Sequence, residues 1–120
     1  MSNRTIRFNV DLTINEGKGD AFQAIAQQMT AGTQNEPGAL VYDWYFSSDR
    51  KRCRLLETYA DAKAMKAHVH GPVVQQLVPK LLEVSKLTRF EVYGEPDAED
   101  AKTLQGVGAE IFSFWNGVSR

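Results

Sequence analysis

Two histidines, His68 and His70, are the residues of this chain best suited to acid–base chemistry near neutral pH. Both stand at the end of a predicted helix over residues 61–71, which a Gly-Pro pair terminates. His68 follows Met65 at helical spacing, which turns it toward the interior, and we predict it to be a general base for a weak acid such as a phenol. The alternative is a helix-end histidine that interacts favourably with the helix dipole. His70 lacks that spacing and is a candidate for substrate binding.

A second group of candidates lies on predicted strands and could surround a flat aromatic substrate. Tyr42 and Trp44 could stack on such a molecule or bind its hydroxyl group, although both residues also suit an ordinary core. Glu57 precedes Tyr59 by two positions on another strand. Glu57 could orient a histidine, or it could form a structural salt bridge with Arg54.

Several classes of function are not favoured by the composition. The formal net charge of −1 gives no reason to expect nucleic acid or an anionic membrane as a partner. No His, Cys or carboxylate spacing indicates a metal site, and no glycine-rich loop indicates a nucleotide. The N-terminus lacks the apolar stretch of a signal peptide, and no apolar run has membrane-spanning length. We therefore predict a cytoplasmic protein without a bound metal or other cofactor.

The elements that must position these side chains follow from hydrophobic periodicity. Residues 5–14 alternate between apolar and polar types, which is typical of a strand with one buried face. The patterns predict strands over 5–14, 39–48, 53–60 and 86–95 and helices over 20–32, 61–71 and 73–85. Asp20 and Asp61 are the predicted N-caps, and Pro79 is expected to kink or break the third helix. The order β-α-β-β-α-β predicts an α+β, ferredoxin-like antiparallel sheet with helices on one face.

Apolar residues on both faces of the predicted strands indicate that the sheet has a second partner. Residues 39–48 carry Leu40, Tyr42, Trp44 and Phe46 on one face, and Val41 and Tyr45 on the other. A sheet that is apolar on two faces needs two covering layers, so we predict a homodimer in which a second copy covers the face opposite the helices.

The C-terminal part of the chain is predicted to be an extension of the first domain. We divide the chain into a ferredoxin-like domain over residues 1–96 and an extension over 97–120. The extension contains a predicted short helix over 97–106 and an apolar stretch over 109–115. An apolar tail is unfavourable in water, so we expect it to dock on its own domain or on the dimer partner.

Three motifs together resemble the antibiotic biosynthesis monooxygenase family of dimeric α/β barrels. They are "EPGALVYDWY", "LLETYAD" and "AMKAHVHGP", and the resembling span covers about residues 5–95. The chain departs from the family where His70 precedes Gly71-Pro72, because the family's second histidine usually follows such a pair, so only His68 transfers well. The family includes cofactor-free oxygenases of phenolic polyketides, enzymes that oxidise quinols, heme-degrading enzymes and members without known activity.

The resemblance narrows the expected chemistry. Heme-degrading relatives need an axial histidine in the following helix, and residues 73–82 contain none, so heme is not expected. Those relatives carry an asparagine in the first strand that can hold an oxygen species, which makes Asn9 a catalytic candidate; the alternative is a polar residue in a dimer interface. The resemblance implies a cofactor-independent monooxygenase acting on a quinol or a polyphenolic or polyketide small molecule. The alternative is a noncatalytic dimeric barrel of a stress-response type that binds a small hydrophobic ligand.

Overall fold

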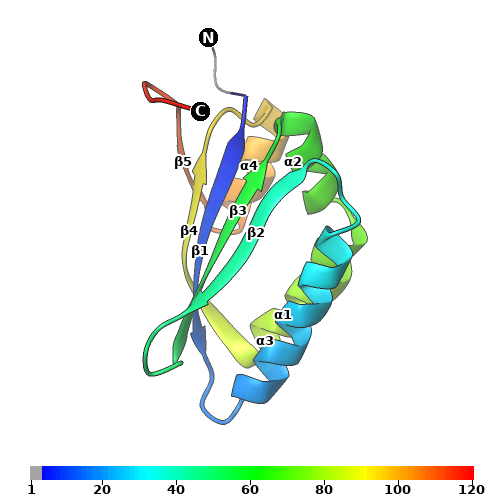
Figure 1. Ribbon diagram of the computed structural model, residues 1–120, viewed down its shortest axis with the longest axis vertical. Helices are drawn as coiled ribbons and strands as arrows, with labels where there is room; N and C mark the ends of the chain where they lie inside the picture. Colours follow the sequence, from blue (N-terminus) through cyan, green and yellow to red (C-terminus); the bar gives the residue numbers. More distant parts are fainter. Residues whose placement is uncertain (1–3) are drawn as a thin grey trace.

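A curved sheet with all helices on one of its faces is the framework of the molecule (Figure 1). The computed structural model describes residues 4–120. In chain order the elements are β1 (Ile6–Ile14), α1 (Gly19–Thr33), β2 (Ala39–Phe46), β3 (Arg52–Tyr59), α2 (Ala62–Val69), the π-helical turn η1 (Val73–Leu77), α3 (Val78–Val84), β4 (Ser85–Tyr93), α4 (Ala98–Gly106) and β5 (Glu110–Phe112). The first three residues of the predicted domain over 1–96 lie outside the described residues.

The predicted α+β, ferredoxin-like plan is confirmed for the first four strands. The strand order is β2-β3-β1-β4-β5, and β1, β2, β3 and β4 pair antiparallel. The predicted all-antiparallel sheet needs one correction, because β5 pairs parallel with β4 and makes the sheet mixed. The sheet is open, with β2 and β5 at its edges, so one copy of the chain does not close a barrel.

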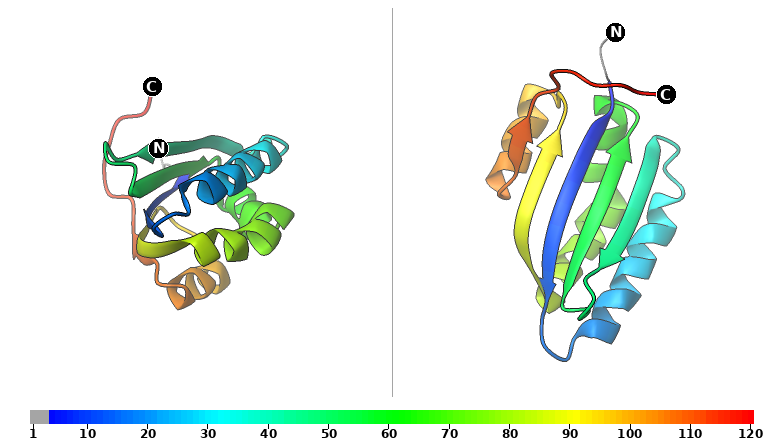
Figure 2. Two further views of the ribbon diagram at one scale, coloured as in Figure 1. Left: turned by 90° about the horizontal axis from the view of Figure 1, so that it is seen from below. Right: turned by 60° about the vertical axis from the view of Figure 1, so that its left-hand side comes forward.

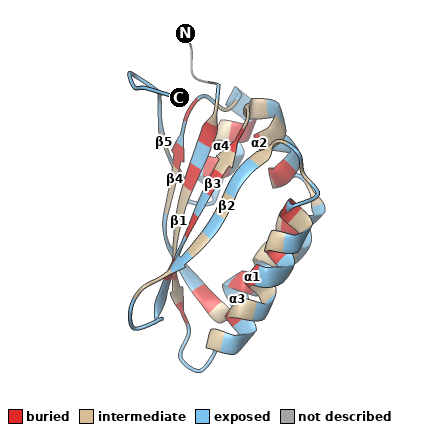
Figure 3. Ribbon diagram, viewed as in Figure 1, coloured by how far each residue is buried: buried red, intermediate tan, exposed pale blue. Residues whose placement is uncertain are grey.

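The two faces of the sheet differ in their environment, as Figure 2 shows. Along β1, Ile6, Phe8, Leu12 and Ile14 are buried against the helices, as the alternation of the sequence predicts. The opposite face, which we call the open face, has no helix over it in either view of Figure 2. Figure 3 shows buried residues alternating with less buried ones along β1 and β3.

Three local predictions can be compared with the structure. Asp61 is the N-cap of α2, because its side chain accepts a hydrogen bond of 2.8 Å from the backbone N–H of Ala64. Asp20 is not an N-cap; α1 begins at Gly19, which places Asp20 in the first turn, where its charge favours the positive end of the helix dipole. Leu40 does not share the buried face of β2, because the register shifts between Ala39 and Val41 and leaves Leu40 56% exposed.

The helix predicted over 73–85 is divided in two by its proline. The π-helical turn η1 ends at Leu77, and α3 begins at Val78 with Pro79 in its first turn. A proline there loses no intrahelical hydrogen bond, because the first N–H groups of a helix have no partner within it. The result is a change of helical geometry directly under the sheet.

Part of the C-terminal extension packs on the same chain. Leu104 of α4 and the nearby Ala109 join the core cluster that contains Phe8 and Tyr59. The strand β5 adds to the sheet edge, where the N–H of Gly94 donates to the carbonyl of Phe112 at 2.9 Å. Beyond β5 the chain is irregular and exposed. Over residues 4–120 we find no helix that has both the length and the apolar character to span a membrane.

Candidate functional site

A cavity of about 290 Å³ lies between the sheet and the helices. Its walls are mostly aliphatic and aromatic side chains from four strands and from every helix, which suits a small apolar ligand. The polar side chains in its lining are few: Tyr42, Glu57, His68, Gln75 and Thr103. An enclosed apolar space with a few polar groups is the usual form of a small-molecule site.

His68 is the titratable side chain of this cavity that is best placed for proton transfer. It lies in the last turn of α2, on the same face as the fully buried Met65, and is 2% exposed. Its Nδ1 atom lies 2.8 Å from Oε1 of Glu36, in the turn that precedes β2. Burial lowers the pKa of His68, and the hydrogen bond and charge of Glu36 oppose this effect. The net lowering of the pKa favours the neutral imidazole.

The contact with Glu36 decides which ring nitrogen is free to act as a base. A carboxylate accepts hydrogen bonds, so Nδ1 of His68 carries the proton and donates it to Glu36. The lone pair is then on Nε2, the atom that lies 3.7 Å from Oε1 of Glu57. This is the tautomer that a general base requires on the cavity side of the ring.

Glu57 is the second buried titratable group of the cavity. It is 5% exposed, and burial raises its pKa to about 7, with the charge of Glu36 acting in the same direction. The Tyr59 hydroxyl donates a hydrogen bond to Glu57 and partly opposes the rise. The suggested salt bridge between Glu57 and Arg54 is not formed, because alternate residues of β3 face opposite sides and Arg54 pairs with Asp11 on the open face at 2.7 Å.

Two tyrosine rings frame His68. The centroids of the Tyr59 and Tyr42 rings lie 5.1 Å and 5.5 Å from the centroid of the imidazole. Tyr42 also lines the cavity, and burial raises its pKa, so its hydroxyl stays protonated. Trp44 lies outside the cavity lining: its Nε1–H donates to Thr30 Oγ1 at 2.8 Å, so Trp44 ties β2 to α1. The structure thus brings Tyr42, Glu57 and Tyr59 to His68 and leaves Trp44 in the packing beside it.

Asn9 and His70 are not brought to the cavity. Phe8 and Val10, the neighbours of Asn9 in β1, line the cavity, so Asn9 itself projects to the open face. There its Nδ2 donates to Glu91 at 3.1 Å, and its Oδ1 is buried and lacks a hydrogen-bond partner among residues 4–120. The side chain of His70 is 54% exposed, and its Nε2 lies 3.1 Å from Oδ1 of Asp100 in α4.

Sequence reasoning missed Glu36 and the contribution of α4 to the cavity. Glu36 precedes the Pro37-Gly38 turn and is 32 positions from His68, so local periodicity carries no signal for their contact. The signal that could have found it is a carboxylate beside a turn that leads into the strand of Tyr42. The side chains from α4 are Thr103, Leu104 and the following Val107.

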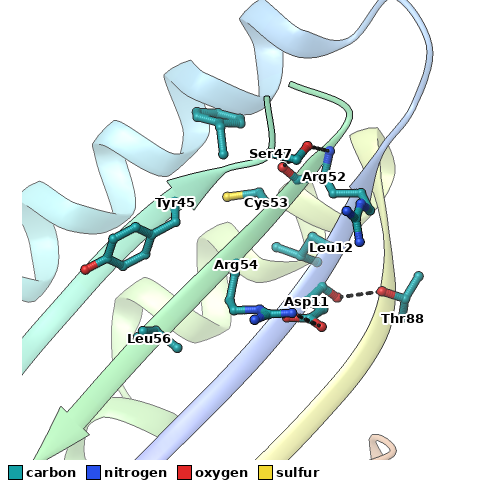
Figure 4. Close-up of a pocket in the computed structure, with 10 residues that line it drawn as sticks. Asp11, Leu12, Tyr45, Ser47, Arg52, Cys53, Arg54, Leu56 and Thr88 are labelled. Atoms are coloured by element: carbon teal, nitrogen blue, oxygen red, sulfur yellow. Dashed lines mark hydrogen bonds and ion pairs between the residues drawn. The ribbon is translucent and has the colours of Figure 1, made fainter. Parts of the chain in front are cut away.

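A second hollow, of about 430 Å³, opens on the other side of the sheet near the β2–β3 hairpin (Figure 4). Figure 4 shows the Asp11–Arg54 ion pair there, with Thr88 donating to the backbone carbonyl of Asp11. These charged groups pair with each other, and the hollow holds no buried acid–base pair comparable to His68 and Glu57. Among residues 4–120 no cluster of three or more His, Cys, Asp or Glu side chains could hold a metal ion.

Comparisons with known proteins show which family the chain resembles and which structures share its fold. The profile of the family described as antibiotic biosynthesis monooxygenase matches residues 5–80. No curated protein sequence matches the chain. The crystal structure of MupZ from Pseudomonas fluorescens is 25% identical with a TM-score of 0.84, and the alignment covers 98% of this chain and 96% of that chain.

Two further solved structures are similar over a shorter span. Rv0793 from Mycobacterium tuberculosis is 24% identical with a TM-score of 0.67, covering 78% of this chain and 96% of that chain. A candidate antibiotic biosynthesis monooxygenase from Caulobacter crescentus is 22% identical with a TM-score of 0.66, covering 75% and 86%. At these identities the two structures establish a shared fold and nothing finer.

Proposed function

The chain belongs to the antibiotic biosynthesis monooxygenase family, and from this premise we propose that it is a cofactor-independent monooxygenase of a quinol or polyphenolic small molecule. The observation that carries the proposal is the position of His68 in the wall of an apolar cavity, with Glu36 on one ring nitrogen and Glu57 near the other. The arrangement supports a neutral imidazole that can accept a proton in a site that excludes most water.

The first step of the proposed reaction is proton transfer. A phenolic hydroxyl of the substrate lies near Nε2 of His68, which takes its proton. The imidazolium that forms lies beside the Glu36 carboxylate, so developing positive charge is favoured on the Nδ1 side of the ring. Tyr42 and the apolar walls hold the aromatic ring, and the phenolate that results is electron-rich enough to reduce O2 directly.

The later steps balance without any external reductant. The phenolate transfers one electron to O2, and the resulting radical and superoxide combine to form a C–O bond, giving a peroxide on the ring. Loss of water breaks the O–O bond and leaves one oxygen atom on the product. For a hydroquinone the overall reaction is hydroquinone plus O2 giving hydroxyquinone plus water, so the substrate supplies all four electrons.

We also propose that a second copy of the chain covers the open face, which bears on water access to the site. Exposed apolar side chains on strands of that face, Val41, Tyr45 and Leu56, are each at least 37% exposed in the single chain. Asn9, whose Oδ1 atom is buried and lacks a hydrogen-bond partner among residues 4–120, lies on the same face. A symmetric pairing of these faces would give the dimeric barrel that the family resemblance implies.

Oxygen uptake tests the proposed reaction. Wild type is compared with His68→Gln and with Lys63→Gln, a change on the exposed side of the same helix, using hydroquinones, anthrones and ¹⁸O2. We expect incorporation of one labelled oxygen atom per product, a loss of rate of about 100-fold or more in His68→Gln, and no loss in Lys63→Gln. Equal rates in wild type and His68→Gln would contradict the proposed role of His68.

The same experiment separates the alternative function. A noncatalytic barrel would bind these aromatic compounds in the cavity but consume no O2 above the uncatalysed rate. Binding in the absence of O2 uptake would therefore replace the monooxygenase proposal by a ligand-binding role, and the mostly apolar lining of the cavity is the observation that favours this alternative.

A further inference from the structure

The helix α4 forms part of the cavity wall although it lies outside the span that defines the family. The family profile matches residues 5–80, and α4 spans Ala98–Gly106. Thr103 and Leu104 of this helix and the adjacent Val107 line the cavity. In Figure 1 α4 lies on the same side of the sheet as the other helices. The shape of the cavity at this end therefore depends on residues outside the span that the family profile matches, within the longer span aligned with MupZ.

The cavity changes in character from one end to the other. Near β2 and β3 its lining contains the buried His68 and Glu57. Toward α3 and α4 its lining contains Leu82 and Val107, which are 43% and 59% exposed. The exposed end is a mouth whose rim is mainly apolar, although Gln75 and Thr103 are also exposed in the lining, and the buried end holds the titratable groups His68 and Glu57. A ligand that matches this distribution has a polar ring at one end and an apolar substituent at the other.

Contacts with α2 hold α4 in place at this mouth. Nε2 of His70 lies 3.1 Å from Oδ1 of the buried Asp100, and Nζ of Lys66 lies 2.8 Å from Oδ2 of Asp97. Leu104 is 3% exposed and packs in the core. The helix that carries His68 is thus joined directly to the helix that forms the rim, so the rim has a defined distance from the base.

We propose that α4 is the specificity-determining wall of the cavity, and that the ligand is a phenol or quinol with an apolar substituent. The ring of the ligand lies against His68, and its apolar substituent extends out of the cavity between Leu82 and Val107. This inference rests on the proposed function for the position of the ring. It adds an apolar substituent to the ligand and assigns the recognition of that substituent to residues outside the span that the family profile matches.

The test measures binding and not turnover, so that it is independent of the oxygenase activity. The probes are phenol, 4-ethylphenol, 4-butylphenol and 4-hexylphenol, titrated by calorimetry without O2 into wild type, Val107→Ser and Val118→Ser. Val107 is more than half exposed, so its replacement is compatible with folding, and Val118 is a matched valine that is 75% exposed in the tail.

For wild type we expect affinity to rise by up to about fourfold for each methylene group that the rim covers. In Val107→Ser we expect phenol to bind as in wild type and 4-hexylphenol to bind several-fold more weakly, whereas Val118→Ser behaves as wild type. Affinity that does not depend on chain length, or an equal loss for all four probes in Val107→Ser, would overturn the proposal. If affinity rises with the length of the alkyl substituent but hydroquinones are not oxidised, the monooxygenase proposal fails and the proposed role of α4 in ligand recognition stands.

Discussion

Nδ1 of His68 lies 2.8 Å from Oε1 of Glu36, and this contact joins the end of α2 to the turn that leads into β2. It fixes the orientation and the tautomer of the imidazole, so that Nε2 is the nitrogen available on the side of Glu57. Glu36 lies outside the cavity lining, yet its hydrogen bond determines which nitrogen of His68 can accept a proton in the cavity.

Replacing Glu36 tests this positioning role. In Glu36→Gln the amide can donate to Nδ1 and favour the wrong tautomer, and the imidazolium loses a neighbouring charge. We expect kcat/KM for an oxidised hydroquinone to fall by roughly one to two orders of magnitude, with KM changed less than kcat. Glu16→Gln, in an exposed loop, is the control. An unchanged kcat/KM in Glu36→Gln would remove Glu36 from the mechanism.

The raised pKa of Glu57 predicts how stability depends on pH. The pKa rises from an ordinary value of 4.5 to about 7 in the fold, so between these values the folded chain holds a proton that the unfolded chain has released. The contribution of Glu57 to stability therefore falls as pH rises through this window. The free energy of unfolding of Glu57→Gln, relative to that of wild type, should therefore rise between pH 4.5 and 7 and stay constant above pH 7.

The expected gain is roughly 3 kcal/mol at most, on the scale of 1.4 kcal/mol for each pKa unit. It is measured by urea unfolding of both proteins at several pH values. His68, whose pKa is lowered by burial, has the opposite sign, because its contribution is lost as pH falls below the ordinary value of 6.5. A difference between wild type and Glu57→Gln that is constant over this pH range would show that Glu57 is not protonated in the fold.

Gly38 provides a test of the packing between the β2 turn and α2. A Cβ atom at this position would lie 2.5 Å from Cβ of Ala64, closer than two such atoms approach. We expect Gly38→Ala to lower the free energy of unfolding by about 1–3 kcal/mol because the turn and helix must separate. Since the same turn carries Glu36, activity should fall as well.

The matched control for this substitution is Gly106→Ala. No atom lies within 4 Å of the added Cβ at Gly106, which is the last residue of α4. We expect this variant to be unchanged or more stable by up to about 1 kcal/mol, measured by thermal unfolding of the two proteins in parallel. Equal effects of the two substitutions would argue against the close contact of Gly38 with α2.

The proposed dimer is tested by its mass in solution. Sedimentation equilibrium of the 13.4 kDa chain should give twice this mass for wild type and a shift toward the single chain for Leu56→Lys, on the open face. A lysine there would place a charge inside the apolar interface. Gln28→Lys, on the exposed side of α1, should remain dimeric. A monomer at all concentrations in wild type would remove the barrel from the account.

The sequence predicts most of the fold because β1 and β3 alternate between more and less buried positions along most of their length. The period-2 pattern of β1 assigned Ile6, Phe8 and Leu12 to the helix side correctly, and Asp61 was recognised as a cap from its position before an amphipathic segment. The bulge at Leu40 was missed, because a one-residue shift in register leaves no mark on local composition. The parallel pairing of β5 was missed because a three-residue strand is too short to show a period.

A residue of the candidate site could be predicted only where the residue pattern within a single helix or strand shows which way its side chain faces. Spacing from Met65 indicated that His68 turns inward, and the alternation of β3 placed Glu57 beside Tyr59. The contact of His68 with Glu36 joins residues from different elements, so it depends on the turn geometry around Gly38, which the pattern does not encode. For the same reason no pattern in the sequence indicates that α4 lines the cavity.

The most direct test of the central claim is the ionisation state of a phenol bound in the cavity. The probe is 4-nitrophenol, whose phenolate has a distinct visible absorbance, added without O2 to wild type and to His68→Gln at a pH below the pKa of the free phenol. We expect the probe to bind to wild type as the phenolate and to His68→Gln as the neutral phenol. A neutral bound phenol in wild type, or phenolate in both proteins, would contradict the claim that His68 takes the proton.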